Sequence, residues 1–136
     1  HELGNLTYTH SSYLSSNSTV VSGLERTDAA VSKAAGVSTK PYMRLPYGSM
    51  TSSLLSAVNR AGYASVTWNV DPMEWAALPP EQVVSNTMGE MKPGSIILLY
   101  ALSAQREEQE LPMLIKAIRD SGMEIAPLSE VLFLGH

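Results

Sequence analysis

The chain has 136 residues, enough for one domain with a single hydrophobic core, and its 44% hydrophobic and 16% charged residues argue against a disordered segment. The net charge of −4 at pH 7 argues against a nucleic-acid partner, since phosphate binding selects for basic surfaces. The absence of cysteine excludes disulfides, thiolate metal sites and a cysteine nucleophile, and no apolar run reaches the ~20 residues that a membrane-spanning helix needs.

Helix-like and strand-like segments alternate along the first half of the chain. In order, we expect a helix at 18–35, a strand at 42–45, a helix at 51–61 and a strand at 63–70. Gly36 is a suitable stop for the first helix. Apolar spacing places four residues on the inner side of the second helix: Leu54, Leu55, Val58 and Ala61.

The second half continues the same alternation. We expect a helix at roughly 80–91, a strand at 95–100, a helix at 111–121 and a short strand at 124–127. The unbroken run Ile96–Leu99 is typical of a strand buried on both faces, and Pro112 is expected in the first turn of its helix. Glu107, Glu108 and Glu110 are expected to be solvated at a helix start, and Ser129 to cap a final helical turn.

This alternation predicts an α/β fold with a parallel sheet or barrel and right-handed crossovers. Functional groups in such folds gather where strands end at their carboxyl side. Four clusters follow successive strand candidates: His10, Arg44–Tyr47, Asn69–Trp75 and Tyr100–Ala101. The sequence therefore predicts that these four clusters meet at one cleft.

Each cluster also has an interpretation without function. His10 is a polar loop residue in that case, and Arg44 is a surface cation beside a turn. Asp71 followed by Pro72 is a common turn signal. Trp68 and Trp75 are then core residues and Tyr100 is a strand end, so no single cluster decides the matter.

Taken together, the clusters are similar to the motifs of the NodB-like polysaccharide deacetylases, carbohydrate esterase family 4. HELGNLTYTH at 1–10 resembles the family segment GHE-I/L-GNHTYTH, and RLPYGS at 44–49 resembles RxPYG. WNVDPMEW at 68–75 resembles WDVDxxDW, and GSIILLY at 94–100 resembles GSIILLH. Four motifs in the right order and spacing cover essentially the whole chain.

The resemblance implies a distorted (β/α) barrel that hydrolyses N-acetyl groups of N-acetylglucosamine polymers such as chitin or peptidoglycan. It implies a divalent metal, usually zinc, that polarises the acetamide carbonyl and activates water. His10 stands at a metal-ligand position, and Arg44 at the position that orients the catalytic aspartate. Asp71 stands at the position that tunes the acid histidine. Residues at substrate-groove positions are Tyr47, Trp68 and Trp75.

Three departures from the family pattern affect the reacting groups. Leu6 occupies the first metal-histidine position and has no lone pair to donate, which leaves His10 as one ligand of three. Tyr100 occupies the acid-histidine position, and tyrosine, with a reference pKa of ~10, is a poor proton shuttle near neutrality. The TFDDG motif, which supplies the base and the aspartate ligand, is not found in the sequence.

We therefore expect residues 1–136 to form one NodB domain, the C-terminal two thirds of the usual barrel, incomplete at its N-terminus. A barrel that does not close leaves strand edges unpaired, so we expect the chain to associate with itself or with a missing N-terminal segment. The expected location is extracellular or in the bacterial cell envelope, with a polysaccharide or peptidoglycan glycan as partner. Zinc binding is expected to be weak or absent.

Three functional hypotheses remain open. The first is a polysaccharide deacetylase-family protein whose catalysis is lost or much reduced. The second is a non-catalytic carbohydrate-binding or interaction module that reuses the groove around Tyr47, Trp68 and Trp75. The third is an ordinary deacetylase in which Leu6 and Tyr100 reflect engineering or a divergent site.

Overall fold

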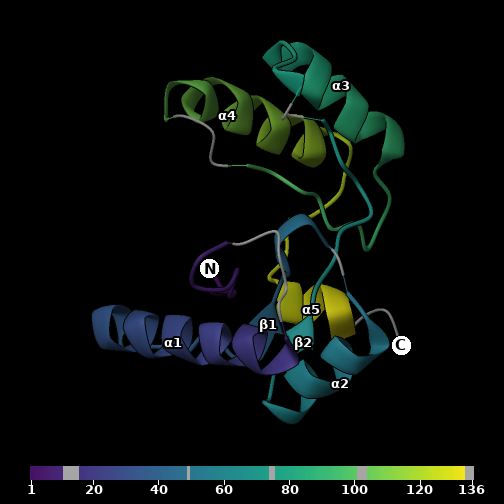
Figure 1. Cartoon of the computed structure of the whole chain (residues 1–136). Helices are drawn as coiled ribbons and strands as arrows, with labels where there is room; N and C mark the ends of the chain where they lie inside the picture. Colours follow the sequence, from purple (N-terminus) through teal and green to yellow (C-terminus); the bar gives the residue numbers. More distant parts are fainter. Residues whose placement is uncertain (11–15, 49, 74–75, 101–103, 134–136) are drawn as a thin grey trace. The chain divides into compact units, whose positions relative to one another are not determined.

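The computed structural model describes residues 1–10, 16–48, 50–73, 76–100 and 104–133 of the chain (Figure 1). These residues form two compact units, His1–Thr67 and Trp68–His136. Each unit has its own helices and its own buried residues.

In the first unit, side chains at the helix starts explain where the helices begin. Helix α1 spans Asn17–Ala35, and the hydroxyl of Ser16 accepts a hydrogen bond from the backbone N–H of Thr19 at 3.2 Å. Gly36 ends α1 with a left-handed φ of 71°, as predicted. Helix α2 spans Ser52–Arg60, and Thr51 caps it by accepting from the N–H of Leu54 at 3.1 Å. Both predicted helices are confirmed.

The first unit also contains the predicted parallel pairing. Strand β1 (Tyr42–Met43) pairs with strand β2 (Ala64–Ser65), with Tyr42 opposite Ala64 and Met43 opposite Ser65. On its other edge β1 forms a parallel bridge to Asn5. The strands are shorter than the expected 42–45 and 63–70, because a one-turn 3-10 helix at Pro46–Gly48 follows β1 closely and β2 leaves the ladder after Ser65.

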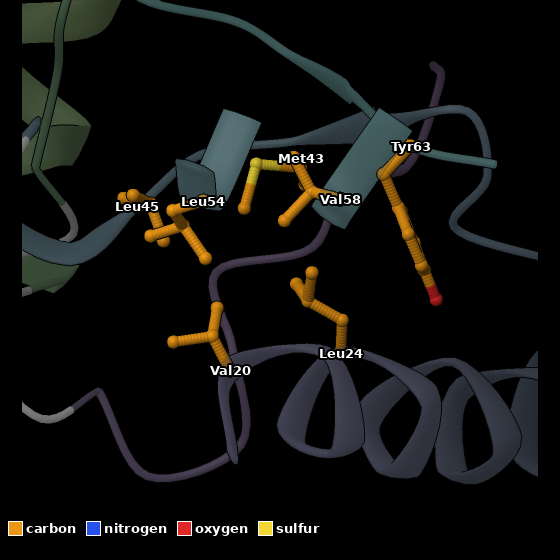
Figure 2. Packing of buried hydrophobic residues seen from close by; sticks show 7 residues of the cluster. All are labelled: Val20, Leu24, Met43, Leu45, Leu54, Val58 and Tyr63. Carbon is orange, nitrogen blue, oxygen red and sulfur yellow. The ribbon is translucent and has the colours of Figure 1, made fainter. Parts of the chain in front are cut away.

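The core of this unit lies between α1, α2 and the strands. Figure 2 shows Val20 and Leu24 pointing from α1 toward residues of the strands and α2. The full cluster is Val20, Leu24, Met43, Leu45, Leu54, Val58 and Tyr63. The prediction for the inner side of α2 is right for Leu54 and Val58 and wrong for Leu55, which is exposed. Leu55 directly follows the buried Leu54, and a helix turns about 100° per residue, so adjacent positions do not share a face.

The second unit contains helices α3 (Pro80–Glu90), α4 (Ala104–Asp120) and α5 (Leu128–Phe133). Helix α3 packs against α4 and buries Val83 and Thr87, while α4 buries Leu114 and Ile118. The strand predicted at 95–100 is reduced to a parallel bridge between Val70 and Ile97. Leu98 is buried but Leu99 is exposed, so the expected burial on both faces is wrong for these residues.

The C-terminal part of the second unit departs most from the predictions. Helix α4 begins at Ala104 rather than near residue 111, so Pro112 lies inside the helix and not in its first turn. Pro112 is on the exposed side, where water can replace the backbone donor that proline lacks. Glu110 is buried, whereas a solvated position was expected. No regular strand forms at 124–127, and Ser129 lies inside α5 rather than at its cap.

No helix among the described residues is long and apolar enough to cross a membrane.

Candidate functional site

The first unit brings His10 and Tyr47 together. Their ring centroids lie 5.5 Å apart with the ring planes tilted by 56°. His10 is exposed. Tyr47 lies in the 3-10 helix that follows strand β1, and it is 70% exposed. Both residues hold left-handed backbone conformations, with φ of 49° at His10 and 61° at Tyr47. Such conformations are unfavourable for residues with a side chain and concentrate at functional sites.

Leu6 is carried on the same segment as His10 and is 44% exposed. Its side chain offers no lone pair, so this position contributes nothing to a metal or to a proton transfer. The backbone turns sharply between Leu6 and His10, because Thr7 also has a left-handed φ of 66°. The N–H of Thr7 donates to the side-chain oxygen of Asn5 at 3.0 Å, which stabilises the turn.

Arg44 stands at the end of β1 and reaches across to the chain that follows β2. Its Nε donates to the carbonyl of Val66 at 3.1 Å, and its Nη2 lies 3.4 Å from the carbonyl of Thr67. The planar guanidinium is thereby held in one orientation. The family role of Arg44, orienting a catalytic aspartate, stays a prediction.

The second unit holds Trp68, Asp71 and Tyr100. The carboxylate of Asp71 accepts a hydrogen bond from the N–H of Met73 at 2.9 Å, the contact of an aspartate that initiates a turn. Trp68 is half-buried and Tyr100 is partly exposed. Trp75, the remaining predicted groove residue, lies outside the described residues. The convergence of His10, Arg44, Asp71 and Tyr100 on one cleft stays a prediction.

Asn5, Thr39 and Asp28 form a hydrogen-bonded polar network beside the His10 segment that the sequence analysis did not predict. Asn5 and Thr39 are buried, and Asp28 is half-buried. The side-chain amide of Asn5 donates to the carbonyl of Leu24 at 2.9 Å and to the hydroxyl of Thr39 at 3.1 Å. Asp28 accepts from the N–H of Thr39 at 2.6 Å and from its hydroxyl at 2.8 Å. Asn5 belongs to the HELGN motif, which was a signal available in the sequence; Thr39 and Asp28 carried none.

These hydrogen bonds lower the pKa of Asp28 below its usual 3.8, chiefly through the backbone N–H and then the hydroxyl of Thr39. The hydroxyl of Ser38 and the charge of Lys40 act in the same direction. Nearby, burial raises the pKa of Tyr63 to about 12. Lys40 lies over the Tyr63 ring at 4.8 Å and pairs with Glu25 at 2.8 Å.

We expect the contribution of Asp28 to stability to be present above its unfolded pKa, near 3.8, and to disappear as pH falls through the lower folded value. Below that pH both folded and unfolded chains carry a protonated Asp28. Urea unfolding of the wild type and of Asp28→Asn across an acid series measures the difference. Asp120→Asn, at an exposed ion pair with Lys116, is the control. A difference in unfolding free energy between the wild type and Asp28→Asn that does not change with pH would contradict the prediction.

The side chains do not fit the metal site that the family motifs imply. Within the described parts of the chain, no group of three or more histidine, aspartate or glutamate side chains is close enough to hold an ion. His10 has a suitable donor, but Leu6 has none. Three protein ligands and an open position are the usual minimum for a hydrolytic zinc. No chemical step is therefore derived through a metal.

Comparison with known proteins agrees with the motifs. The sequence profile described as polysaccharide deacetylase matches residues 1–66. A chitooligosaccharide deacetylase of Bradyrhizobium sp. (strain ANU 289) is 34% identical over 103 residues, covering 66% of this chain and 47% of that protein. A peptidoglycan-N-acetylglucosamine deacetylase of Bacillus cereus is 28% identical over 102 residues, covering 74% of this chain and 37% of that protein. The chain thus spans less than half the length of either relative.

A solved structure shows the same fold. The wild-type CE4 family pseudoenzyme from Bacillus anthracis is 22% identical and superposes with a TM-score of 0.85, covering 95% of this chain and 45% of that one. The predicted fold class, a partial NodB-like α/β barrel, is thereby confirmed. The motifs, the sequence relatives and the profile match over residues 1–66 agree, and the predicted resemblance to the polysaccharide deacetylase family is confirmed.

Proposed function

We propose that this chain forms part of the glycan-binding groove of a polysaccharide deacetylase-family protein in which hydrolysis is lost or much reduced. The proposed ligand is an N-acetylglucosamine polymer, chitin or peptidoglycan, reached outside the cell or in its envelope. The choice of polymer is supported by the matched relatives, a chitooligosaccharide deacetylase and a peptidoglycan-N-acetylglucosamine deacetylase.

The observation that carries this proposal is the pairing of His10 with Tyr47. A 70% exposed tyrosine ring, held against a histidine ring in a left-handed backbone, is a rigid apolar platform with polar edges. The apolar face of a sugar ring packs on such a surface, while the ring nitrogens of His10 remain available to sugar hydroxyls. Binding of this kind needs neither a metal nor a base.

Hydrolysis needs more than a platform. It needs a group that polarises the acetamide carbonyl, a base for water and an acid for the departing amine. Leu6 and Tyr100 stand at two of the positions that would contribute to this chemistry. The proposed loss of hydrolysis therefore affects groups that would take part in the reaction. Arg44 and Tyr47 remain at positions that orient a catalytic group and bind the substrate.

The alternative is a non-catalytic module that binds glycan or another partner by reusing the same groove. The fold allows it, because the CE4 family pseudoenzyme from Bacillus anthracis has the same fold. Turnover separates the two proposals: a slow release of acetate supports a weakened enzyme, and binding without any release supports the module.

We expect the chain to bind N-acetylglucosamine oligomers and Tyr47→Ala to weaken that binding about tenfold. A sugar face covering roughly 50 Å² of the ring accounts for about 1.3 kcal/mol at ~25 cal/mol per Å². Calorimetric titration gives the affinity, and an acetate assay on the same samples gives turnover. Val37→Ala is the control, because Val37 is an exposed apolar residue that precedes β1 whereas Tyr47 follows it.

Two outcomes would count against the proposal. If Tyr47→Ala and Val37→Ala bind as the wild type does, then the platform is not the glycan site. Acetate release by this chain at the rate of a working deacetylase would show that the reacting groups are present after all.

A further inference from the structure

We infer that Asp28, Thr39 and Asn5 form a positioning relay, which sets the path of residues 5–10 and so holds the His10 ring against Tyr47. This deepens the proposed function, because the His10–Tyr47 platform is its binding surface. The three residues are positioning residues, since no contact links their side chains directly to either ring. The relay consists of a continuous series of hydrogen bonds from helix α1 to the turn before His10.

The relay ends where the His10 segment leaves the sheet. The N–H of Asn5 donates to the carbonyl of Tyr42 at 3.0 Å, and the carbonyl of Asn5 accepts from the N–H of Arg44 at 2.8 Å. Beyond Asn5 the backbone takes left-handed conformations at Thr7 and His10. Because such conformations are unfavourable for residues with a side chain, surrounding contacts must hold the segment in place.

Asn5 is the residue that supplies these contacts. Its side chain is 2% exposed and uses every donor and its acceptor. The amide nitrogen donates to Leu24 on α1 and to Thr39, while the amide oxygen accepts from the N–H of Thr7. One buried side chain therefore connects α1, the loop before β1 and the turn leading to His10.

The hydrogen bonds of Thr39 run in one direction, from Asn5 through Thr39 to Asp28. Its hydroxyl has a single proton, which it donates to Asp28 at 2.8 Å, so the oxygen is left to accept from Asn5 at 3.1 Å. The Thr39 side chain is fully buried, and the same Asp28 oxygen also accepts from its N–H and from the hydroxyl of Ser38. A carboxylate with three donors on one oxygen fixes the orientation of the Thr39 hydroxyl.

A second contact holds the same segment against α1. The guanidinium carbon of Arg26 lies 3.7 Å from the centroid of the Tyr8 ring. Gly23 faces the backbone of Tyr8 closely, since a Cβ at Gly23 would lie 3.8 Å from the Tyr8 nitrogen. Tyr8 and Asn5 thus attach residues 5–10 to helix α1 at two points. The attachment through Asn5, which belongs to the relay, is the buried one.

The test is Thr39→Val, which keeps the shape of threonine and removes the hydroxyl. Proton NMR of the full chain reports the cross-peak between the His10 and Tyr47 rings and the shifts of the His10 ring protons. We expect Thr39→Val to abolish the cross-peak and move these shifts toward their values in an unfolded chain. Thr39→Ser, which keeps the hydroxyl, is expected to retain both signals.

A matched variant separates positioning from stability. Val58→Ala weakens the same core, because Val58 is fully buried, but the valine side chain takes no part in the hydrogen bonds of the relay. We expect it to lower the unfolding midpoint and leave the ring cross-peak intact. If Thr39→Val does not fold, Asp28→Asn provides the same comparison, since it weakens the acceptor that orients Thr39 while keeping the size of the side chain.

The inference is overturned if a folded Thr39→Val or Asp28→Asn chain keeps the wild-type cross-peak and His10 shifts, or if Val58→Ala loses them equally. Its failure is distinguishable from failure of the proposed function. A lost cross-peak with unchanged oligosaccharide affinity supports the relay and rejects the platform as the glycan site. Wild-type signals together with Tyr47-dependent affinity reject the relay alone.

Discussion

Replacing Leu24 with alanine is expected to lower the free energy of unfolding of the first unit by about 2–5 kcal/mol. Leu24 is 0% exposed and lies in the core cluster between α1, α2 and the strands (Figure 2). Removing its buried methyl groups loses transfer free energy and leaves a cavity. A typical domain has only ~5–15 kcal/mol of stability, so the effect is large.

Leu55→Ala is the matched control, because Leu55 lies on α2 and is 39% exposed. We expect a change of about 0.5 kcal/mol or less, as for most surface substitutions. Urea unfolding followed by circular dichroism gives both values from the transition midpoints. An equal loss of unfolding free energy for Leu24→Ala and Leu55→Ala would show that Leu24 does not lie in a well-packed core.

Replacing Leu6 with histidine is expected to raise the zinc affinity of the chain at least ~10–100-fold. In other metal sites, removing a group that only hydrogen-bonds to a ligand lowers the metal affinity about 10–100-fold. Here a ligand itself would be added, so the gain in affinity is expected to be at least as large. The substitution restores the four-residue spacing of the two family histidines, with His10 as the second. Leu6 is exposed, so the fold is expected to tolerate the change. Titration against a competing chelator measures the affinity.

Leu3→His is the control for this gain, because Leu3 is exposed on the same segment but does not occupy a metal-histidine position of the motif. We expect it to bind zinc no better than the wild type. Adding His10→Ala to Leu6→His is expected to remove the gain. If Leu6→His binds no more tightly than Leu3→His, residues 6 and 10 do not face a common point. One equivalent of zinc held tightly by the wild type through His10 would also contradict our prediction.

Local sequence signals were sufficient to predict an element where a side chain and the backbone within a few residues of it determine the local structure. Ser16 and Thr51 cap α1 and α2 within three residues of their own positions, and Gly36 ends α1 by its own backbone conformation. Val20 and Leu24, four positions apart on one face of α1, are both buried. Helix periodicity is a property of consecutive residues, so it is readable from the sequence.

Prediction was poorer where partners far away in the chain decide the outcome. The run at 96–99 has the composition of a strand buried on both faces, yet pairing is limited to Val70 and Ile97. Strand length depends on the neighbour that supplies the hydrogen bonds, and composition does not reveal that neighbour. Helix α4 starts at Ala104 and so extends past Pro112 toward its N-terminus, with Glu110 buried ahead of the proline, an extension that the proline alone did not predict.

The sequence by itself determined the family resemblance and which residues stand at the predicted reacting positions. Order and spacing of four motifs are properties of the chain, and so are Leu6 and Tyr100. The sequence placed the His10 and Arg44–Tyr47 clusters at one expected cleft, and the tertiary structure brings the His10 and Tyr47 ring centroids to 5.5 Å. The tertiary structure alone decided that Asn5, Thr39 and Asp28 are connected beside that segment. Asn5 and Thr39 are 34 positions apart, and no local periodicity links such residues. Their contact exists because β1 returns beside Asn5 and because buried polar atoms must find partners where the fold brings them.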